Sequence, residues 1–132
     1  MAWIVGVLLA LAAGLFATGI GLDRDRAFYP TVMIVIALLY ILFAAIGAST
    51  GVLLRESVTT AIFIVVAVVG FRTSLWWVVA ALAAHGIFDY AHDTYVVNAG
   101  VPSWWPAFCA AYDVTAAAYI AWLIRSRQQS TR

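Results

Sequence analysis

Five runs of about twenty mostly apolar residues limit what this chain can fold into. A helix needs about 20 such residues to cross the hydrocarbon core of a bilayer, and short polar or glycine-containing turns separate the runs. The expected helices span residues 3–21, 29–47, 52–69, 75–92 and 104–124. Hydrophobic residues make up 66% of the chain and charged residues 10%, whereas soluble domains carry roughly a quarter charged residues. The sequence therefore predicts an all-α integral membrane protein, a five-transmembrane-helix bundle forming a single membrane domain over residues 1–132.

The charged residues exclude a nucleic-acid-binding protein. The chain has no lysine, and six acidic residues nearly balance its seven arginines, so it lacks a basic patch that would hold phosphates. The single cysteine, Cys109, cannot form a disulfide within the chain and is interpreted as a small core residue. A cleavable signal peptide is disfavoured for the first apolar run because no Lys or Arg precedes it.

Small residues recur at every fourth position of the first run, at Gly6, Ala10, Gly14 and Thr18. Such a stripe lets helix backbones approach closely in lipid. We interpret it as tight packing within the bundle, with the interface of a homo-oligomer as the alternative. Membrane lipids and a second copy of the chain are therefore the expected partners, and no nucleic acid is expected.

The arginines indicate how the bundle lies in the membrane. In a five-span arrangement, one side carries Arg24, Arg26, Arg72, Arg125, Arg127 and Arg132. The other side carries Arg55 alone. Cytoplasmic loops of membrane proteins carry an excess of Arg and Lys, so we expect the N-terminus outside and the C-terminus in the cytoplasm. Tryptophans support this topology, since Trp76, Trp77 and Trp122 fall at the expected inner interface and Trp3, Trp104 and Trp105 at the outer one.

Four of the six acidic residues and both histidines fall in the outer half of the predicted bundle. His85, Asp89 and His92 follow the spacing i, i+4, i+7, which places them on one helix face. At 1.5 Å per residue, His85 lies about 10–12 Å below the outer end of its helix, and Asp113 lies roughly 10 Å below the outer end of the next. Glu56 lies one turn inside the third helix. Ionisable groups at such depths cost a few kcal/mol each unless they are paired, protonated or bound to a cation.

A metal ion is one source of the positive charge that these residues require. Histidines with carboxylates suit zinc, iron or manganese. We expect His85, His92 and Asp113 to bind a divalent metal, zinc or iron, with Asp89 or Glu56 as a further ligand or general base. His85 and His92 lie about 10.5 Å apart along the helix axis. The two histidines could bind the same ion only if both side chains were fully extended toward it. Asp89 is therefore alternatively a residue that does not bind the metal itself but orients a metal ligand.

Each candidate also has a purely structural alternative. His85 is then a neutral hydrogen-bonding partner between helices, and His92 and Asp93 belong to a solvated helix end. Glu56 then pairs with its neighbour Arg55 or lies at a helix N-terminus, where negative charge is favoured.

Three segments together resemble a family of small bacterial inner-membrane proteins of unknown function. They are Phe28-Tyr29-Pro30, His85-Gly86-x-x-Asp89-x-x-His92 and Pro102-x-Trp104-Trp105-Pro106-x-x-Cys109-x-x-x-Asp113. This resemblance implies a multi-pass protein of the bacterial plasma membrane and names no activity. His85-x-x-x-Asp89 in an intramembrane His/Asp cluster is also similar to the superfamily of alkaline ceramidases and adiponectin-type receptors. Those are seven-helix zinc hydrolases of lipid amides with three histidines in the site, whereas this chain has five apolar runs and two histidines.

Three functions remain open from the sequence. The first is a metal-dependent membrane hydrolase or oxidoreductase, in which metal-bound hydroxide forms beside a lipid-like substrate. The second is a transport module that binds protons or a cation, although the inner halves of the last three helices are almost wholly apolar. The third is a structural or assembly subunit of a membrane complex, in which the polar cluster only locks helix packing.

Overall fold

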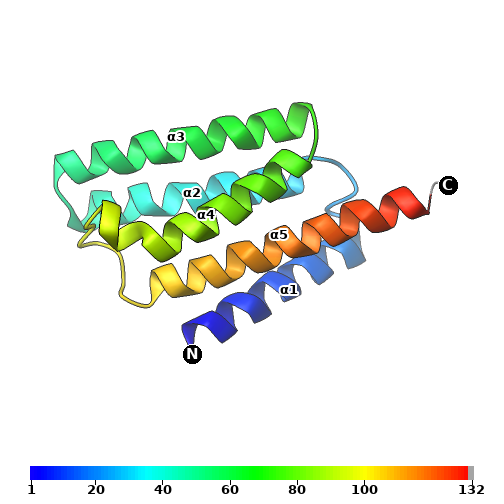
Figure 1. Ribbon diagram of the computed structural model, residues 1–132, viewed down its shortest axis with the longest axis horizontal. Coiled ribbons are helices and arrows are strands. Elements are labelled where there is room, and N and C mark those ends of the chain that lie inside the picture. Colours follow the sequence, from blue (N-terminus) through cyan, green and yellow to red (C-terminus); the bar gives the residue numbers. More distant parts are fainter. Residues whose placement is uncertain (131–132) are drawn as a thin grey trace.

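The computed structural model describes residues 1–130, which form a bundle of five α-helices running side by side (Figure 1). The helices are α1 (Ala2–Ile20), α2 (Phe28–Gly47), α3 (Thr50–Arg72), α4 (Trp76–Tyr95) and α5 (Trp105–Gln129). Within the described chain, α1, α2, α3 and α5 are the four helices long and apolar enough to cross a membrane. The all-helical fold is therefore confirmed, and four of the five expected spans are consistent with a membrane protein. Arg132, expected on the cytoplasmic side, lies outside the described residues.

Helix α5 lies between α1 and α4, and α2 packs against α3 on the other side of α4. The small residues of α1 face α5: a Cβ atom at Gly6 would collide with the Phe108 carbonyl oxygen, and one at Gly14 would lie 2.8 Å from the Tyr119 ring. The stripe therefore serves close packing inside the bundle, because only residues without large side chains allow backbones this near one another.

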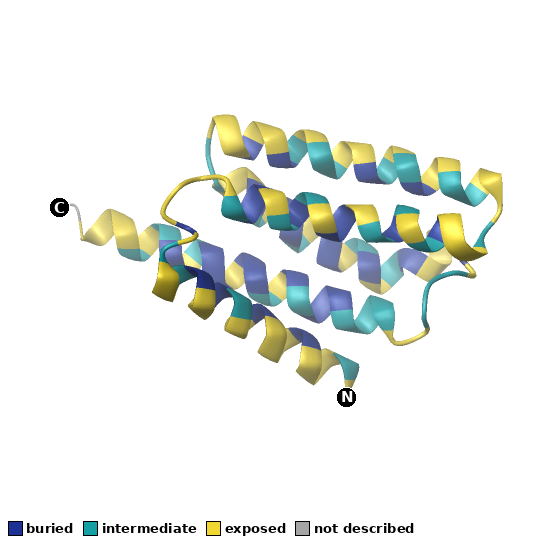
Figure 2. Cartoon of the chain, turned by 180° about the vertical axis from the view of Figure 1, so that it is seen from behind, coloured by how far each residue is buried: buried dark blue, intermediate teal, exposed yellow. Residues whose placement is uncertain are grey.

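The bundle buries polar groups and exposes apolar ones. Its buried polar side chains include Asp23, Glu56, His85, Asp89, His92 and Asp113. Large apolar side chains such as Leu8, Phe16, Ile46, Val58 and Ile87 point outward, and Figure 2 shows the exposed residues along the outer sides of the helices. Soluble monomers rarely expose such large contiguous apolar areas. This surface suits hydrocarbon.

Several helix ends differ from the expected ones. The third helix, expected to end at residue 69, continues through Gly70 to Arg72, and a Cβ atom at Gly70 would meet Val78 Cγ2 of α4 at 2.6 Å. Its role is therefore close packing. Helix α4 continues past His92 to Tyr95, and α5 continues past Ile124 to Gln129, so that α5 includes Arg125 and Arg127.

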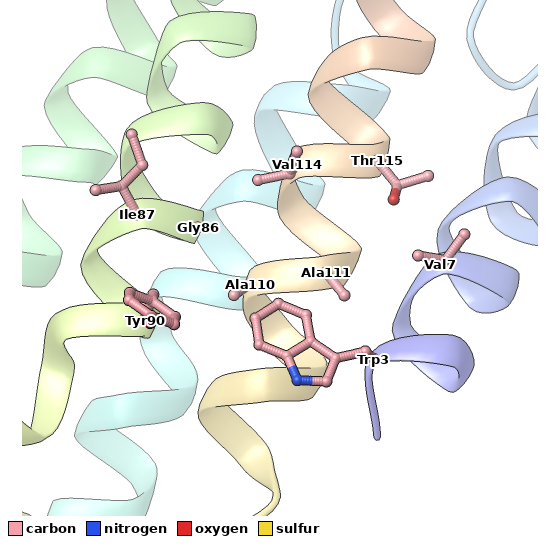
Figure 3. Close-up of a pocket in the computed structure, with 9 residues that line it drawn as sticks. All are labelled: Trp3, Val7, Gly86, Ile87, Tyr90, Ala110, Ala111, Val114 and Thr115. Carbon is pink, nitrogen blue, oxygen red and sulfur yellow. The ribbon is translucent and has the colours of Figure 1, made fainter. Parts of the chain in front are cut away.

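An apolar groove of about 410 Å³ opens between α1 and α4, with α5 as its floor (Figure 3). We call it the α1–α4 groove. Trp3 and Tyr90 lie at one end of it, and its small lining residues include Gly86 of α4 and Ala110 of α5. These two residues directly follow His85 and Cys109 in the chain, so the groove runs past the polar interior of the bundle.

Candidate metal centre

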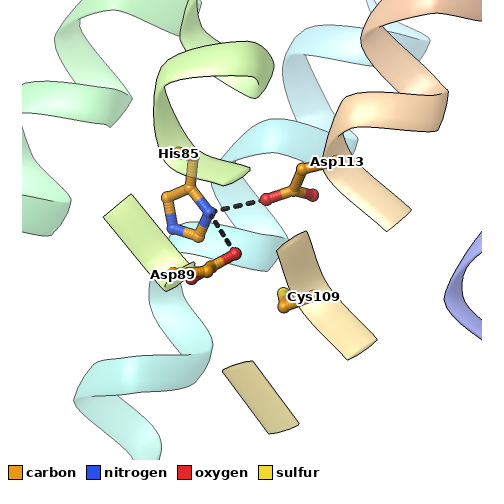
Figure 4. A group of neighbouring side chains, drawn as sticks. All are labelled: His85, Asp89, Cys109 and Asp113. Atoms are coloured by element: carbon orange, nitrogen blue, oxygen red, sulfur yellow. Dashed lines mark hydrogen bonds and ion pairs between the residues drawn. The ribbon is translucent and has the colours of Figure 1, made fainter. Parts of the chain in front are cut away.

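Four potential metal ligands meet between α4 and α5, at His85, Asp89, Cys109 and Asp113 (Figure 4). We call this group the four-residue centre. Every member is at most 2% exposed. Each helix contributes two side chains four residues apart, and this spacing stacks them on the same helix face. The centre therefore follows directly from two helical repeats that face each other.

Small residues let α4 and α5 approach closely enough for these side chains to meet. A Cβ atom at Gly86 would lie 3.2 Å from the Ala110 carbonyl oxygen and 3.3 Å from the Asp113 Cβ. Both distances are at the tight end of van der Waals contact, so a larger residue at Gly86 would push the helices apart. The glycine next to His85 is thus part of what positions the centre.

The hydrogen bonding within the centre is incomplete. His85 Nδ1 lies 2.7 Å from Asp113 Oδ2 and 3.3 Å from Asp89 Oδ2, and one ring nitrogen donates at most one proton. Neither oxygen of Asp89, nor Oδ1 of Asp113, accepts a hydrogen bond of good geometry from the described residues. Buried polar groups without a partner are rare in native proteins, and a bound ion or water is a common explanation for them.

Besides His85, the Tyr40 hydroxyl and the Cys109 thiol also face the Asp89 carboxylate. Within residues 1–130, no arginine forms an ion pair with Asp89 or Asp113. Two carboxylates thus share one imidazole in an apolar setting, where an unpaired charge costs several kcal/mol. The centre must take up protons or a cation to be stable.

The donor atoms are spaced closely enough for one ion. One nitrogen, one sulfur and two carboxylate oxygens, one from each residue, lie within 4.8 Å of one another. In a tetrahedral zinc site with bonds of 2.0–2.3 Å, ligand atoms lie about 3.3–3.8 Å apart. Side-chain adjustments of about 1 Å would therefore convert the centre into a four-coordinate site.

A second buried polar group lies closer to the ends of α3 and α4. Glu56 Oε1 accepts hydrogen bonds from His92 Nε2 and from Asn98 Nδ2, both at 2.9 Å. Asn98 also donates to the backbone oxygen of Tyr40 at 3.3 Å, so this group fastens the segment after α4 onto α2 and α3. His92 Nδ1 lies 3.5 Å from Asp93, whose side chain is 81% exposed. This second group therefore extends to the surface.

The structure divides the five predicted site residues between these two groups. His85, Asp89 and Asp113 meet in the four-residue centre, whereas His92 and Glu56 pair with each other. His92 is buried and does not lie at a solvated helix end, and Glu56 pairs with His92 of α4 instead of its neighbour Arg55. The individual roles predicted for the five residues, as ligands or as a general base, stay predictions.

Sequence reasoning missed three residues that complete the two groups. Cys109 lies one helical turn from Asp113 on the same face, and this spacing is the signal that could have placed it in the centre. Tyr40 stacks on the His92 ring with 4.2 Å between ring centroids, and its ring lies 6.1 Å from that of His85. Tyr40 and Asn98 have no comparable signal, because their positions depend on how α2 and the α4–α5 connection pack.

A third polar group closes the opposite end of the bundle around Asp23. Its carboxylate accepts hydrogen bonds from Thr18 Oγ1 at 2.6 Å, from Tyr29 at 3.1 Å and from Arg127 Nη2 at 2.8 Å. Burial alone would raise the pKa of Asp23, but these hydrogen bonds and the charge of Arg127 together hold it below its usual 3.8. Because Thr18, Tyr29 and Arg127 all donate to the Asp23 carboxylate, this group is a structural connection between α1, α2 and α5.

Comparisons with protein-family models, with curated proteins and with solved structures found no match to this chain. The family resemblances noted in the sequence therefore stay predictions, and the geometry of the four-residue centre is the basis for what the protein does.

Proposed function

We propose that this chain is a membrane protein that binds a divalent transition metal, zinc or iron, between α4 and α5. The ligands would be His85, Asp89, Cys109 and Asp113. The observation that supports this most strongly is that the buried carboxylates of Asp89 and Asp113 share one imidazole, and that neither Asp89 oxygen accepts a hydrogen bond of good geometry. Metal ligands must be deprotonated, so a bound ion would replace the proton that His85 shares and the proton of the thiol. A thiolate in the ligand set favours zinc over manganese.

The arrangement favours holding an ion over catalysis. Structural zinc sites use four protein ligands, whereas catalytic sites keep one position for water. Four donors are present here, and all are nearly inaccessible. In this proposal the ion ties α4 to α5, and the protein is a metal-stabilised structural component of the membrane.

Lipid hydrolysis by the same ion is a second candidate, and the α1–α4 groove is the observation that favours it. A lipid tail in this groove would pass Gly86 and Ala110, which separate it from the centre. If Cys109 is not a ligand, water can occupy the fourth position and become hydroxide. The deciding experiment is release of fatty acid from a ceramide-type amide by zinc-loaded protein, with Asp113→Asn as the inactive control.

Transport across the membrane has less support. On the side of the centre toward Asp23, the buried interior of the described chain contains Met33, Val78, Leu82 and Ile120, all apolar. An ion or proton entering the centre would meet this apolar layer instead of a continuous polar path.

We further propose that α4 is the fifth membrane span, in a bacterial plasma-membrane protein with its N-terminus outside and its C-terminus in the cytoplasm. Helix α4 has 20 residues, as many as α2. Its polar residues His85, Asp89 and His92 are buried, so its low hydropathy reflects side chains that face the bundle and not the lipid. The excess of arginines at one end supports the orientation.

The metal-binding proposal predicts stoichiometric metal in the purified protein. We expect mass spectrometry of protein equilibrated with Zn²⁺ or Fe²⁺ to find about one ion per chain, and the affinity to fall at least about 100-fold in Asp89→Asn and Asp113→Asn. These substitutions keep side-chain volume and remove the negative charge. Cobalt substitution adds a second measurement, because a thiolate–cobalt charge-transfer band should be present and should vanish in Cys109→Ser.

Asp93→Asn is the matched control, since Asp93 lies on the same helix with an 81% exposed side chain. It should bind metal as the unmodified protein does. Circular dichroism checks that each variant is folded. Folded protein that binds no metal, or metal that survives in both Asp89→Asn and Asp113→Asn, would contradict the proposal.

A further inference from the structure

Most of the arginines gather at one end of the bundle, where Asp23 lies. They are Arg24, Arg26, Arg72, Arg125 and Arg127, five of the six arginines within residues 1–130. They come from the α1–α2 connection, the end of α3 and the end of α5, which lie at one end of the bundle in Figure 1. The acidic residues there are Asp23, which pairs with Arg127, and Asp25, which accepts a hydrogen bond from the Ala27 N–H. This basic end therefore carries a net positive charge.

An apolar hollow of about 350 Å³ opens at the basic end. Leu75, Ile120, Leu123 and Ile124 line it, and Arg127 and Gln128 lie where it follows α5 toward the helix end. The lining thus changes from apolar to polar over two turns of α5. A phospholipid has the same order of parts, since an acyl chain leads to a charged headgroup.

The aromatic residues place this hollow at the depth of lipid headgroups. Trp76, Trp77 and Trp122 are exposed at this end, and tryptophans with outward-facing rings concentrate at membrane–water interfaces. The Arg125 guanidinium lies 5.6 Å from the centre of the Trp76 ring, which holds its charge at the same depth. Guanidinium groups bind phosphate strongly and in fixed geometry.

The larger α1–α4 groove provides a contrast within the same molecule. No arginine lines it, and its rim carries Trp3 and Tyr90. Apolar hollows therefore occur at both ends of the described bundle, but only the basic end combines one with several positive charges. An apolar hollow next to several positive charges complements a lipid with an acyl chain and a negative headgroup.

We propose that the basic end binds a phospholipid with an anionic headgroup, with one acyl chain in the hollow beside α5 and the phosphate near Arg125 and Arg127. The site lies at the opposite end of the bundle from the four-residue centre and does not depend on a metal. Each arginine close to a membrane surface contributes an attraction to anionic lipids that corresponds to about a fivefold change in affinity.

Native mass spectrometry of the protein in detergent tests this proposal, with added phosphatidylglycerol or phosphatidylcholine of identical acyl chains. We expect one phosphatidylglycerol molecule to remain bound at concentrations where phosphatidylcholine does not. Arg125→Gln should weaken phosphatidylglycerol binding about fivefold. Ile124→Trp, which fills the hollow and keeps every charge, should weaken the binding of both lipids.

Arg55→Gln is the control, because it removes one arginine from the opposite end, and it should leave lipid binding unchanged. Thermal unfolding identifies any variant that has lost its fold. Equal retention of the two lipids, or an equal loss in Arg55→Gln and Arg125→Gln, would overturn the proposal. Displacement of phosphatidylglycerol by inorganic phosphate would overturn it as well, because it would reveal an anion site without an acyl-chain site.

Discussion

Asp23 is a buried carboxylate whose negative charge is fully compensated by hydrogen bonds and by an ion pair with Arg127. Its carboxylate receives hydrogen bonds from three elements, and Arg127 also donates to its backbone oxygen at 2.9 Å. We expect Asp23→Asn to lower the free energy of unfolding by about 2 kcal/mol, the value of a buried charge-assisted hydrogen bond. Thermal or denaturant unfolding in detergent measures this change. Asp25→Asn, at an exposed position nearby, should change the stability by a few tenths of a kcal/mol.

The same residue predicts how stability depends on pH. The pKa of Asp23 is lower in the folded protein than its ordinary 3.8, so its ionised form favours folding. This contribution is fully present above pH 3.8 and is lost as the pH falls through the lowered folded value. The difference in stability between the unmodified protein and Asp23→Asn should therefore shrink on acidification. A difference that stays constant down to pH 2 would contradict the assignment.

At the residue scale, the sequence predicts which side chains are functional candidates better than it predicts their pairing. The i, i+4 spacing of His85 and Asp89 indicates a shared face, and the structure confirms that they meet. Which residues of neighbouring helices join them depends on how the helices pack. Asp113 of α5 pairs with His85, which the sequence places at a similar depth, whereas Glu56 of α3 pairs with His92 nearer the helix ends. The depths estimated from the sequence agree with this partition, but they do not show which helices are neighbours.

Helix α4 depends on Gly86 for its distance from α5. We expect Gly86→Ala to push the two helices apart, because the new Cβ would lie 3.0 Å from Val114 Cγ2 and 3.2 Å from the Ala110 oxygen. The expected cost is about 1–3 kcal/mol of stability, with a drop of about tenfold in metal affinity as the ligands separate. Unfolding and metal titration of the same samples measure both effects.

Gly19→Ala is the matched control, since nothing lies within 4 Å of a Cβ atom at that position. It exchanges the same two residue types on a helix face without neighbours. If both variants lose metal affinity equally, close packing at Gly86 does not position the centre.

At the scale of elements, hydropathy locates all five helices but predicts some of their ends wrongly. Gly70 looks like a helix terminus because glycine commonly ends helices, yet it lies inside α3, where Val78 packs against it. The α5 helix runs to Gln129, beyond the apolar run that ends near Ile124. Polar residues can continue a helix past the hydrocarbon boundary. Hydropathy therefore marks the edge of the membrane and not the residue at which the helical backbone hydrogen bonds end.

For the whole molecule, the proposed topology places the α2–α3 connection outside and the α3–α4 connection in the cytoplasm. We expect a membrane-impermeant maleimide to label Ser49→Cys in intact cells, and to label Ser74→Cys only after the membrane is opened. Cys109 is buried, so the unmodified protein should stay unlabelled and serves as the control. Labelling of Ser74→Cys, and not Ser49→Cys, in intact cells would reverse the orientation.

The side-by-side packing of α1 and α5 sets the order in which this bundle can be completed. Ribosomes add roughly 5–20 residues per second, so about 5–20 s separate the synthesis of the two helices. During that interval the glycine face of α1 has lipid as its neighbour, because the helix that covers it has not yet been made. Translation speed and membrane insertion, and not only equilibrium stability, should therefore determine how much of this protein reaches its final fold.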